Sequence, residues 1–149
     1  MDLKNSIYTH IENLLSEKIS AITEALGLAR ESRDSDTKSS AGDKHETSRA
    51  LAQIEIDKLE VQLNKTLILE KELQSINLHK KYDQVEMGCL VITNQENYFI
   101  SIGMGKVEVE GRIFYAISVH SPIGEMLKLK QVGEKVRFNG REIVVKEIL

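Results

Sequence analysis

The apolar residues in the first part of the chain recur three and four positions apart. This spacing places them on one side of a helix, so it predicts a long amphipathic helix. Its apolar positions are Ile7, Ile11, Leu14, Leu15, Ile19, Ile22, Leu26 and Ala29. The pattern weakens at Arg30, and residues 31–42 contain no apolar residue except Ala41. Their Ser, Thr and Asp side chains compete for backbone hydrogen bonds, which predicts a loop.

A second long helix is predicted after this loop, with two apolar rows. One row holds Leu51, Ile54, Val61 and Ile68, and a parallel row holds Ile56, Leu59, Leu63, Leu67, Leu69, Leu73 and Ile76. Two helices of about 30 to 35 residues would each be roughly 45 to 55 Å long, too long for a small second domain to cover. We therefore expect an antiparallel two-helix coiled-coil hairpin. A dimeric or four-helix coiled coil is the alternative.

The last part of the chain has the pattern of short strands separated by turns. β-branched and aromatic residues dominate the predicted strands, at 89–93, 98–102, 106–109, 112–119, 135–138 and 142–148. Glu110-Gly111 and Asn139-Gly140 are signals of tight turns in an antiparallel sheet. Ser121 followed by Pro122 is typical of a helix N-terminus and predicts a short helix to about Leu127.

The composition changes where the predicted helices give way to strands. Residues 84–149 hold the single proline and seven of the nine glycines, whereas residues 1–83 hold the other two glycines. We therefore predict two domains: a coiled-coil hairpin over 1–83 with an acidic tip near 31–47, and a β-rich domain over 84–149. The predicted fold class is α+β.

Charge, cysteine content and hydropathy indicate which partners and which cellular compartment the protein has. The formal net charge is -3 and basic residues alternate with acidic ones, so the sequence lacks the basic cluster of a protein that binds duplex nucleic acid. Cys89 is the only cysteine, which excludes an intrachain disulfide and favours a reducing compartment. No apolar run approaches the length of a membrane helix. We expect a soluble, cytoplasmic protein that does not bind membranes.

Two acidic residues lie at the predicted start of the second helix. Asp43 and Glu46 are three positions apart and therefore share a helix face. One interpretation is a capping-box-like start, in which acids favour the helix dipole. The other is a contribution to a Mg²⁺ site, because hard oxygen ligands suit this ion. Two carboxylates make an incomplete site, so they would complete a metal centre of another protein.

Three segments of the sequence resemble one known family. Gly42-Asp43-Lys44-His45-Glu46 resembles the Gly-Asp-x-x-Glu tip that bacterial Gre transcript-cleavage factors carry between two long helices. Residues 121–127, Ser-Pro-Ile-Gly-Glu-Met-Leu, and residues 132–136, Val-Gly-Glu-Lys-Val, look like the Ser-Pro-Leu-Gly and Val-Gly-Asp segments of the Gre C-terminal domain. The resemblance spans nearly the whole chain.

The resemblance implies a transcription elongation factor that binds RNA polymerase through its secondary channel. The C-terminal domain would be FKBP-like without isomerase activity and would dock at the channel rim, through the region of Ser121, Pro122, Ile123 and Gly124. Asp43 and Glu46 would help to hold a Mg²⁺ of the polymerase active centre and stimulate the polymerase's own cleavage of backtracked RNA. We expect a monomer that touches the nascent RNA only indirectly and binds no cofactor tightly.

The tip also departs from the family pattern, which keeps other functions open. Gre factors have Asn directly after the Glu and an aromatic residue three positions further on, where this chain has Thr47 and Ala50. One alternative is therefore a channel-binding regulator or inhibitor that does not stimulate cleavage. Another is a self-associating structural coiled-coil protein. An enzyme is not expected, because the sequence offers no nucleophile with a base, complete metal site or cofactor loop.

Overall fold

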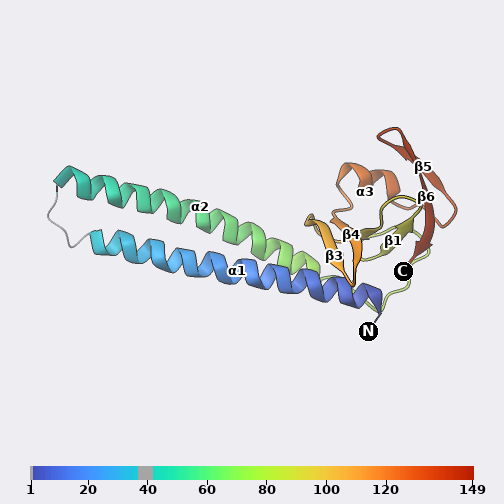
Figure 1. The fold of residues 1–149 in the computed structure, drawn as a ribbon, viewed down its shortest axis with the longest axis horizontal. Coiled ribbons are helices and arrows are strands. Elements are labelled where there is room, and N and C mark those ends of the chain that lie inside the picture. Colours follow the sequence, from blue (N-terminus) through green and yellow to red (C-terminus); the bar gives the residue numbers. More distant parts are fainter. Residues whose placement is uncertain (1, 37–41) are drawn as a thin grey trace. The chain divides into compact units, whose positions relative to one another are not determined.

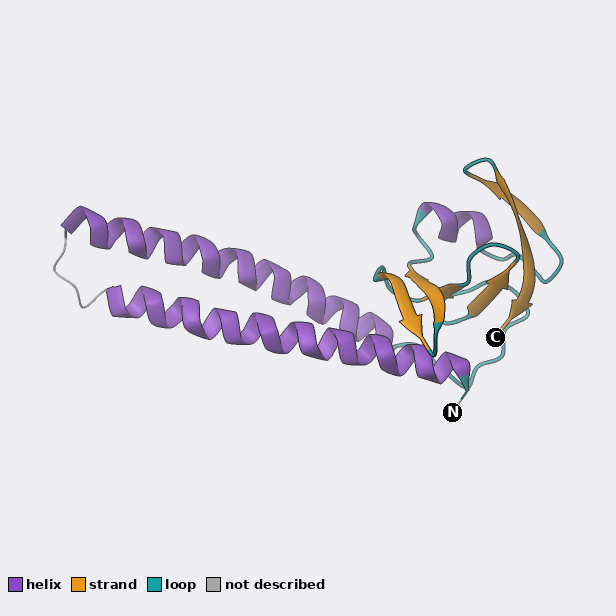
Figure 2. Cartoon of the chain, viewed as in Figure 1, coloured by secondary structure: helices purple, strands orange, loops and turns teal. Residues whose placement is uncertain are grey.

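The computed structural model describes residues 2–36 and 42–149, except for the side chains of residue 36 and residues 42–45. Two long helices precede a six-stranded, mostly antiparallel sheet and a short helix (Figure 1, Figure 2). The predicted α+β fold class, with a helical hairpin and a β domain, is confirmed. The chain forms two compact units, one of residues 13–70 and one of residues 1–12 and 71–149, so each long helix contributes to both.

The first helix is longer than the sequence indicates. Helix α1 spans Leu3–Asp36 and helix α2 spans Gly42–Gln74, so residues 31–36 are helical and their prediction as loop is wrong. Contacts with α2 explain the extension: Nη1 of Arg33 donates a hydrogen bond to Oε1 of Gln53 at 3.0 Å. Local competition for backbone hydrogen bonds is outweighed by this tertiary contact. Residues 37–41 of the predicted loop lie outside the described residues, and Gly42, its last residue, begins α2.

In the unit of residues 13–70, α1 and α2 run side by side in opposite directions (Figure 1). Buried Ile22 and Leu26 of α1 pack with buried Ile56 and Leu59 of α2. Leu63 and two alanines of α1 cover the edges of this cluster. At the margin, Nη2 of Arg30 lies 3.3 Å from Oε1 of Glu60. The predicted helical hairpin is thus held by a narrow apolar seam with a polar border.

The second unit contains the sheet, in the strand order β3-β4-β2-β1-β6-β5. Its strands are β1 (Leu90–Thr93), β2 (Tyr98–Ile100), β3 (Gly105–Val109), β4 (Arg112–Ile117), β5 (Lys135–Phe138) and β6 (Arg141–Ile148), and helix α3 (Pro122–Leu127) lies between β4 and β5. Four neighbouring pairs are antiparallel, whereas β2 and β4 are parallel. The mostly antiparallel sheet agrees with the sequence prediction, with the β2–β4 pair as a parallel exception.

Both predicted tight turns are present. Glu110 and Gly111 connect β3 to β4 with φ of 54° and 74°, and Asn139 and Gly140 connect β5 to β6 with φ of 50° and 77°. Positive φ at both central positions is the geometry whose twist matches that of antiparallel strands. These two turns therefore fix the register of both hairpins at opposite edges of the sheet.

The core of this unit is larger than the hairpin seam. Buried residues from four strands and α3 form one cluster: Val85, Cys89, Val91, Tyr98, Ile100, Leu127, Val136, Ile143 and Val145. The first turns of α1 and the end of α2 belong to the same unit, where Ile7, Ile11 and Leu73 are also buried. In the part of the chain that the structure describes, no helix combines the length and apolar content needed to cross a membrane.

Candidate partner-binding sites

The first turn of α2 carries the two acids of the predicted tip. The helix begins at Gly42, so the backbone of Asp43 and Glu46 lies in its first turn, as the sequence predicts. Glu46 is exposed, and the side chain of Asp43 lies outside the described residues. Carboxylates at this position favour the helix N-terminus, whose free N–H groups carry partial positive charge. The exposed Glu46 carboxylate is also accessible to a partner.

A metal at this position would need ligands from elsewhere. Mg²⁺ prefers six oxygen ligands in octahedral geometry and usually keeps several waters. Among the side chains that the structure describes, no group of three or more His, Cys, Asp or Glu residues could hold a metal ion. One exposed glutamate and one neighbouring aspartate fit the partial role of completing a centre held mainly by another molecule. Their assignment as Mg²⁺ ligands stays a prediction.

Beyond the first turn, α2 exposes one of its two predicted apolar rows. Leu51, Ile54, Val61 and Ile68 are between 53% and 62% exposed, whereas Ile56 and Leu59 of the parallel row are buried. We call the exposed set the outer row. The sequence predicts both rows, but the seam between α1 and α2 uses only one of them. The outer row is therefore available to another molecule.

The segment Ser121–Gly124, predicted to contact a partner, mixes structural and exposed residues. Oγ of Ser121 accepts a hydrogen bond from the amide of Gly124 at 3.1 Å and donates one to the carbonyl oxygen of Ser118 at 2.7 Å, so Ser121 caps α3. Gly124 is buried, and a Cβ there would collide with the carbonyl oxygen of Ser118. Pro122 is exposed and Ile123 is half-buried. Only these two present apolar surface to a partner.

A shallow pocket of about 230 Å³ extends from Ile123 over the sheet. Its other lining residues are Glu96, Tyr98, Tyr115, Phe138 and Arg141. Arg141 donates hydrogen bonds to both carboxylate oxygens of Glu96, at 3.1 and 2.9 Å, and the Tyr98 hydroxyl donates to Oε2 at 3.3 Å. The pocket thus pairs an aromatic wall with a fixed ion pair, a surface suited to an apolar side chain of a partner.

These contacts shift the ionisation of both acidic groups. The Arg141 guanidinium lowers the pKa of Glu96, chiefly through its hydrogen bonds. Burial, with the adjacent Glu96 carboxylate, raises the pKa of Tyr98 to about 12. Glu96 is therefore charged and Tyr98 neutral at neutral pH, which keeps the hydrogen bond between them intact. The sequence carries no local signal for this cluster, because Glu96 and Arg141 are far apart along the chain.

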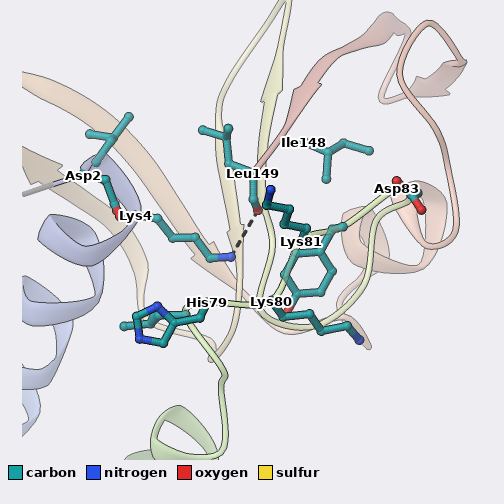
Figure 3. A pocket seen from close by; sticks show the side chains of 11 residues that line it. Asp2, Lys4, His79, Lys80, Lys81, Asp83, Ile148 and Leu149 are labelled. Carbon is teal, nitrogen blue, oxygen red and sulfur yellow. Dashed lines mark hydrogen bonds between the residues drawn. The ribbon is translucent and has the colours of Figure 1, made fainter.

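A larger pocket, of about 560 Å³, lies where the start of α1 meets residues 78–83 and the end of β6 (Figure 3). Lys4 extends across it, and its Nζ donates a hydrogen bond to the carbonyl oxygen of Leu149 at 3.2 Å. The same Nζ lies 4.6 Å from the centre of the Tyr82 ring. Lys4 is only 6% exposed, and this burial lowers its pKa. We assign Lys4 a role in joining α1 to the sheet.

Cys89 is poorly suited to nucleophilic chemistry. It is fully buried, and burial raises the pKa of its thiol to about 11. The thiolate is the reactive form, so it is scarcely populated at neutral pH. Cys89 therefore fills space in the core.

Comparison with known proteins adds no assignment to these sites. No protein-family model matches the chain, and no curated protein sequence matches it. The resemblance to Gre factors therefore rests on the three segments at Gly42–Glu46, Ser121–Leu127 and Val132–Val136, and it stays a prediction. The FKBP-like fold of the sheet domain also stays a prediction.

Proposed function

We propose that this protein is a Gre-like accessory factor that binds RNA polymerase through its secondary channel and stimulates cleavage of backtracked RNA. The observation that carries the proposal is the start of α2 at Gly42, which puts Asp43 and Glu46 in the first turn beside the hairpin connection. Acids at this position, between two long helices, are the defining feature of the Gre-like motif.

The dimensions of the helices support this role. From residue 13 to residue 36, α1 rises about 36 Å, at about 1.5 Å per residue. A pair of packed helices is about 20 Å wide with its side chains, since one helix measures about 10 to 12 Å and packed axes lie about 8 to 10 Å apart. Such a hairpin is slender enough to reach into a narrow channel.

The proposed chemistry needs only two ligands from this chain. Asp43 and Glu46 would supply carboxylate oxygens to a Mg²⁺ held mainly by polymerase residues and RNA phosphates. The bound ion would lower the pKa of a coordinated water and stabilise charge on the scissile phosphate. The part of this chain is to place negative charge beside the ion.

The sheet domain would bind the rim of the polymerase channel. Pro122 and Ile123 offer apolar surface beside the aromatic pocket of Tyr98, Tyr115 and Phe138. Ser121 and Gly124 act indirectly, because they fix the start of α3 and hence the positions of both neighbours.

The test is the length of RNA in a purified cognate polymerase stalled in a backtracked complex with Mg²⁺. The protein is expected to shorten the RNA from its 3′ end, and Asp43→Ala or Glu46→Ala is expected to abolish the effect. Glu24→Ala is a matched control, because Glu24 is an exposed acid elsewhere on the hairpin with no ion pair among the described residues. Equal cleavage by all four proteins would refute the proposal, as would no cleavage by the parent protein.

A second candidate function is a channel-binding regulator that does not stimulate cleavage. The observation that favours it is the presence of Thr47 and Ala50 where the Gre pattern has Asn and an aromatic residue. Bound protein that slows nucleotide addition and leaves the backtracked RNA uncut would select this function. A Thr47→Asn, Ala50→Tyr double variant that then gains cleavage would assign the difference to these two positions.

A further inference from the structure

The pocket at the start of α1 gathers lysine side chains from two segments that are far apart in the sequence. Lys4 belongs to the first turn of α1, whereas Lys80 and Lys81 belong to the segment between α2 and β1. Lys80 and Lys81 are also the only two adjacent lysines in the sequence. The two acidic side chains of the lining, Asp2 and Asp83, lie on opposite sides of the view in Figure 3, with the lysines between them. Positive charge is therefore concentrated in the middle of the pocket.

Two of these ammonium groups share one aromatic ring. Nζ of Lys4 lies 4.6 Å from the centre of the Tyr82 ring, and Nζ of Lys80 lies 5.1 Å from the same point. The two cations are therefore no more than about 10 Å apart, which is about one Debye length at 0.1 M salt. The ring attracts both cations but carries no net charge that would offset their repulsion. An anion bound beside them would remove that repulsion.

The protein itself supplies little negative charge to balance the lysines. Nζ of Lys80 is 4.0 Å from Oε2 of Glu86, and the two side chains are 53% and 38% exposed, so water weakens this pair. The carboxylate of Asp2 caps α1, because its Oδ1 accepts a hydrogen bond from the backbone amide of Asn5 at 2.8 Å. In the described part of the chain, exposed Lys81 forms no ion pair.

Lys4 is held in place and retains donors for a ligand. An ammonium group has three N–H donors, and the hydrogen bond to the carbonyl oxygen of Leu149 uses one of them. Lys4 is only 6% exposed, yet it lines the pocket. Its ammonium group is therefore fixed at the wall of the pocket, so a ligand would not have to order a mobile side chain there.

The rest of the lining is mainly apolar. Aliphatic surface comes from Leu3, Leu78, Ile148 and Leu149, beside the ring of Tyr82. The volume of about 560 Å³ lies within the range of sites for small organic molecules. An inorganic anion would leave this apolar surface in water, and an uncharged apolar molecule would leave the lysines without a partner. The lining therefore fits a ligand that has an anionic group and an apolar body.

We propose that this pocket binds a small organic phosphate, with its phosphate group near the three lysines and its apolar body against Leu78 and Ile148. Lysine binds phosphate as a point charge, and three ammonium groups suit the near-dianionic charge of a phosphate monoester better than the single charge of a carboxylate. All lining residues belong to one compact unit, so the bound ligand would stabilise that unit. This inference goes beyond the proposed function, which does not use the pocket.

Titration of the full chain with phenyl phosphate, followed by the NMR shifts of backbone amides, tests the proposal. Saturable shifts are expected at Lys4 and residues 78–83, with an affinity about fivefold or more above that of inorganic phosphate or of benzyl alcohol, because neither probe makes both kinds of contact. Equal affinity for inorganic phosphate would show that the apolar wall contributes nothing. Equal affinity for benzyl alcohol would show that the lysines contribute nothing. Either result, or no saturable shift, would overturn the proposal.

Removal of one lysine tests the anion contact. Lys81→Ala is expected to weaken phenyl phosphate binding about fivefold, the size of one partly exposed charge contact, without loss of an ion pair in the folded chain. Lys106→Ala is the matched control, since Lys106 is an exposed lysine on β3 of the same unit, outside the pocket. Equal loss in both variants would show general attraction to a basic surface and would overturn the proposal.

Truncation of the apolar wall tests the position of the ligand. Leu78→Ala is expected to weaken phenyl phosphate binding and to leave the affinity for inorganic phosphate unchanged, because the half-buried Leu78 side chain contacts only the apolar body. An equal effect on the two probes would contradict this placement. None of these measurements uses polymerase, so failure of the proposed function leaves the phosphate site standing, and the reverse holds too.

Discussion

The hairpin and the sheet domain bury their apolar residues in cores of different size. In the sheet unit, residues from four strands and α3 share one buried cluster, while Ile113, Leu129 and Val132 remain exposed. In the hairpin unit, the seam uses one row of α2 and leaves the outer row exposed. The sheet unit therefore has the larger buried cluster, whereas the exposed apolar residues of the hairpin lie mainly along one face of α2. The proposed function uses both units, because the acids Asp43 and Glu46 belong to α2 and the docking surface belongs to the sheet domain.

Core truncation in the sheet domain should have the largest effect on stability. Ile143 is fully buried in β6, so Ile143→Ala is expected to lower the free energy of unfolding by about 2 to 5 kcal/mol. Ile54→Ala in the outer row is expected to stay within about 0.5 kcal/mol, as exposed substitutions do. Urea unfolding measures both, followed by tyrosine fluorescence for Ile143→Ala and by far-UV circular dichroism for Ile54→Ala. Similar losses for the two variants would contradict the comparison.

Truncation in the hairpin seam should cost less than in the sheet. Ile56 is 1% exposed, and Ile56→Ala is expected to cost about 2 kcal/mol, near the lower limit for such changes, because the walls of a narrow seam can move inward. All four tyrosines of the chain, Tyr8, Tyr82, Tyr98 and Tyr115, belong to the sheet unit. The variant should therefore shift the far-UV helix signal more than the tyrosine signal. A larger tyrosine shift would contradict this expectation.

Loss of the α3 cap should have an intermediate effect. Ser121→Ala removes the acceptor for the Gly124 amide and is expected to cost about 1 kcal/mol. Ser121→Asp, which keeps an acceptor, should retain most of the stability. Chemical denaturation of the three proteins measures the differences. Equal stability of Ser121→Ala and the parent would show that the cap contributes nothing.

The ion pair beside the docking pocket should have the smallest effect and a defined pH dependence. Hydrogen bonds from Arg141 lower the folded-state pKa of Glu96, so the contribution is complete above the unfolded pKa and is lost as pH falls through the folded value. Glu96→Gln is expected to cost about 0.5 kcal/mol at neutral pH, since the pair is partly exposed. The difference between variant and parent should vanish in acid. A difference that grows in acid would reverse the assigned sign.

Local patterns predicted the helices, the two tight turns and the α3 cap, because each depends on neighbouring residues. Local patterns gave wrong predictions where contacts between distant segments determine the structure. Residues 31–36 are helical although their composition favours a loop, and the parallel pairing of β2 with β4 joins strands separated by β3. Burial of Lys4 depends on Leu149, at the other end of the sequence.

For the candidate sites too, the sequence predicted the segments but not which of their residues are exposed. The sequence located Asp43, Glu46 and the Ser121–Gly124 segment, but not which members of that segment are exposed. It also found both apolar rows of α2 without distinguishing them, since both have nearly the same spacing. Only packing against α1 shows that Ile56 belongs to the seam and Ile54 to the outer surface.

The central claim is that the first turn of α2 stimulates RNA cleavage while the sheet domain binds the polymerase. It is tested most directly by measuring polymerase affinity and RNA cleavage together for two variants, Asp43→Ala with Glu46→Ala, and Ile123→Asp. The tip variant is expected to bind with unchanged Kd and not to stimulate cleavage, whereas Ile123→Asp is expected to bind weakly and to regain cleavage at high concentration. Unchanged cleavage by the tip variant, or unchanged binding by Ile123→Asp, would contradict it.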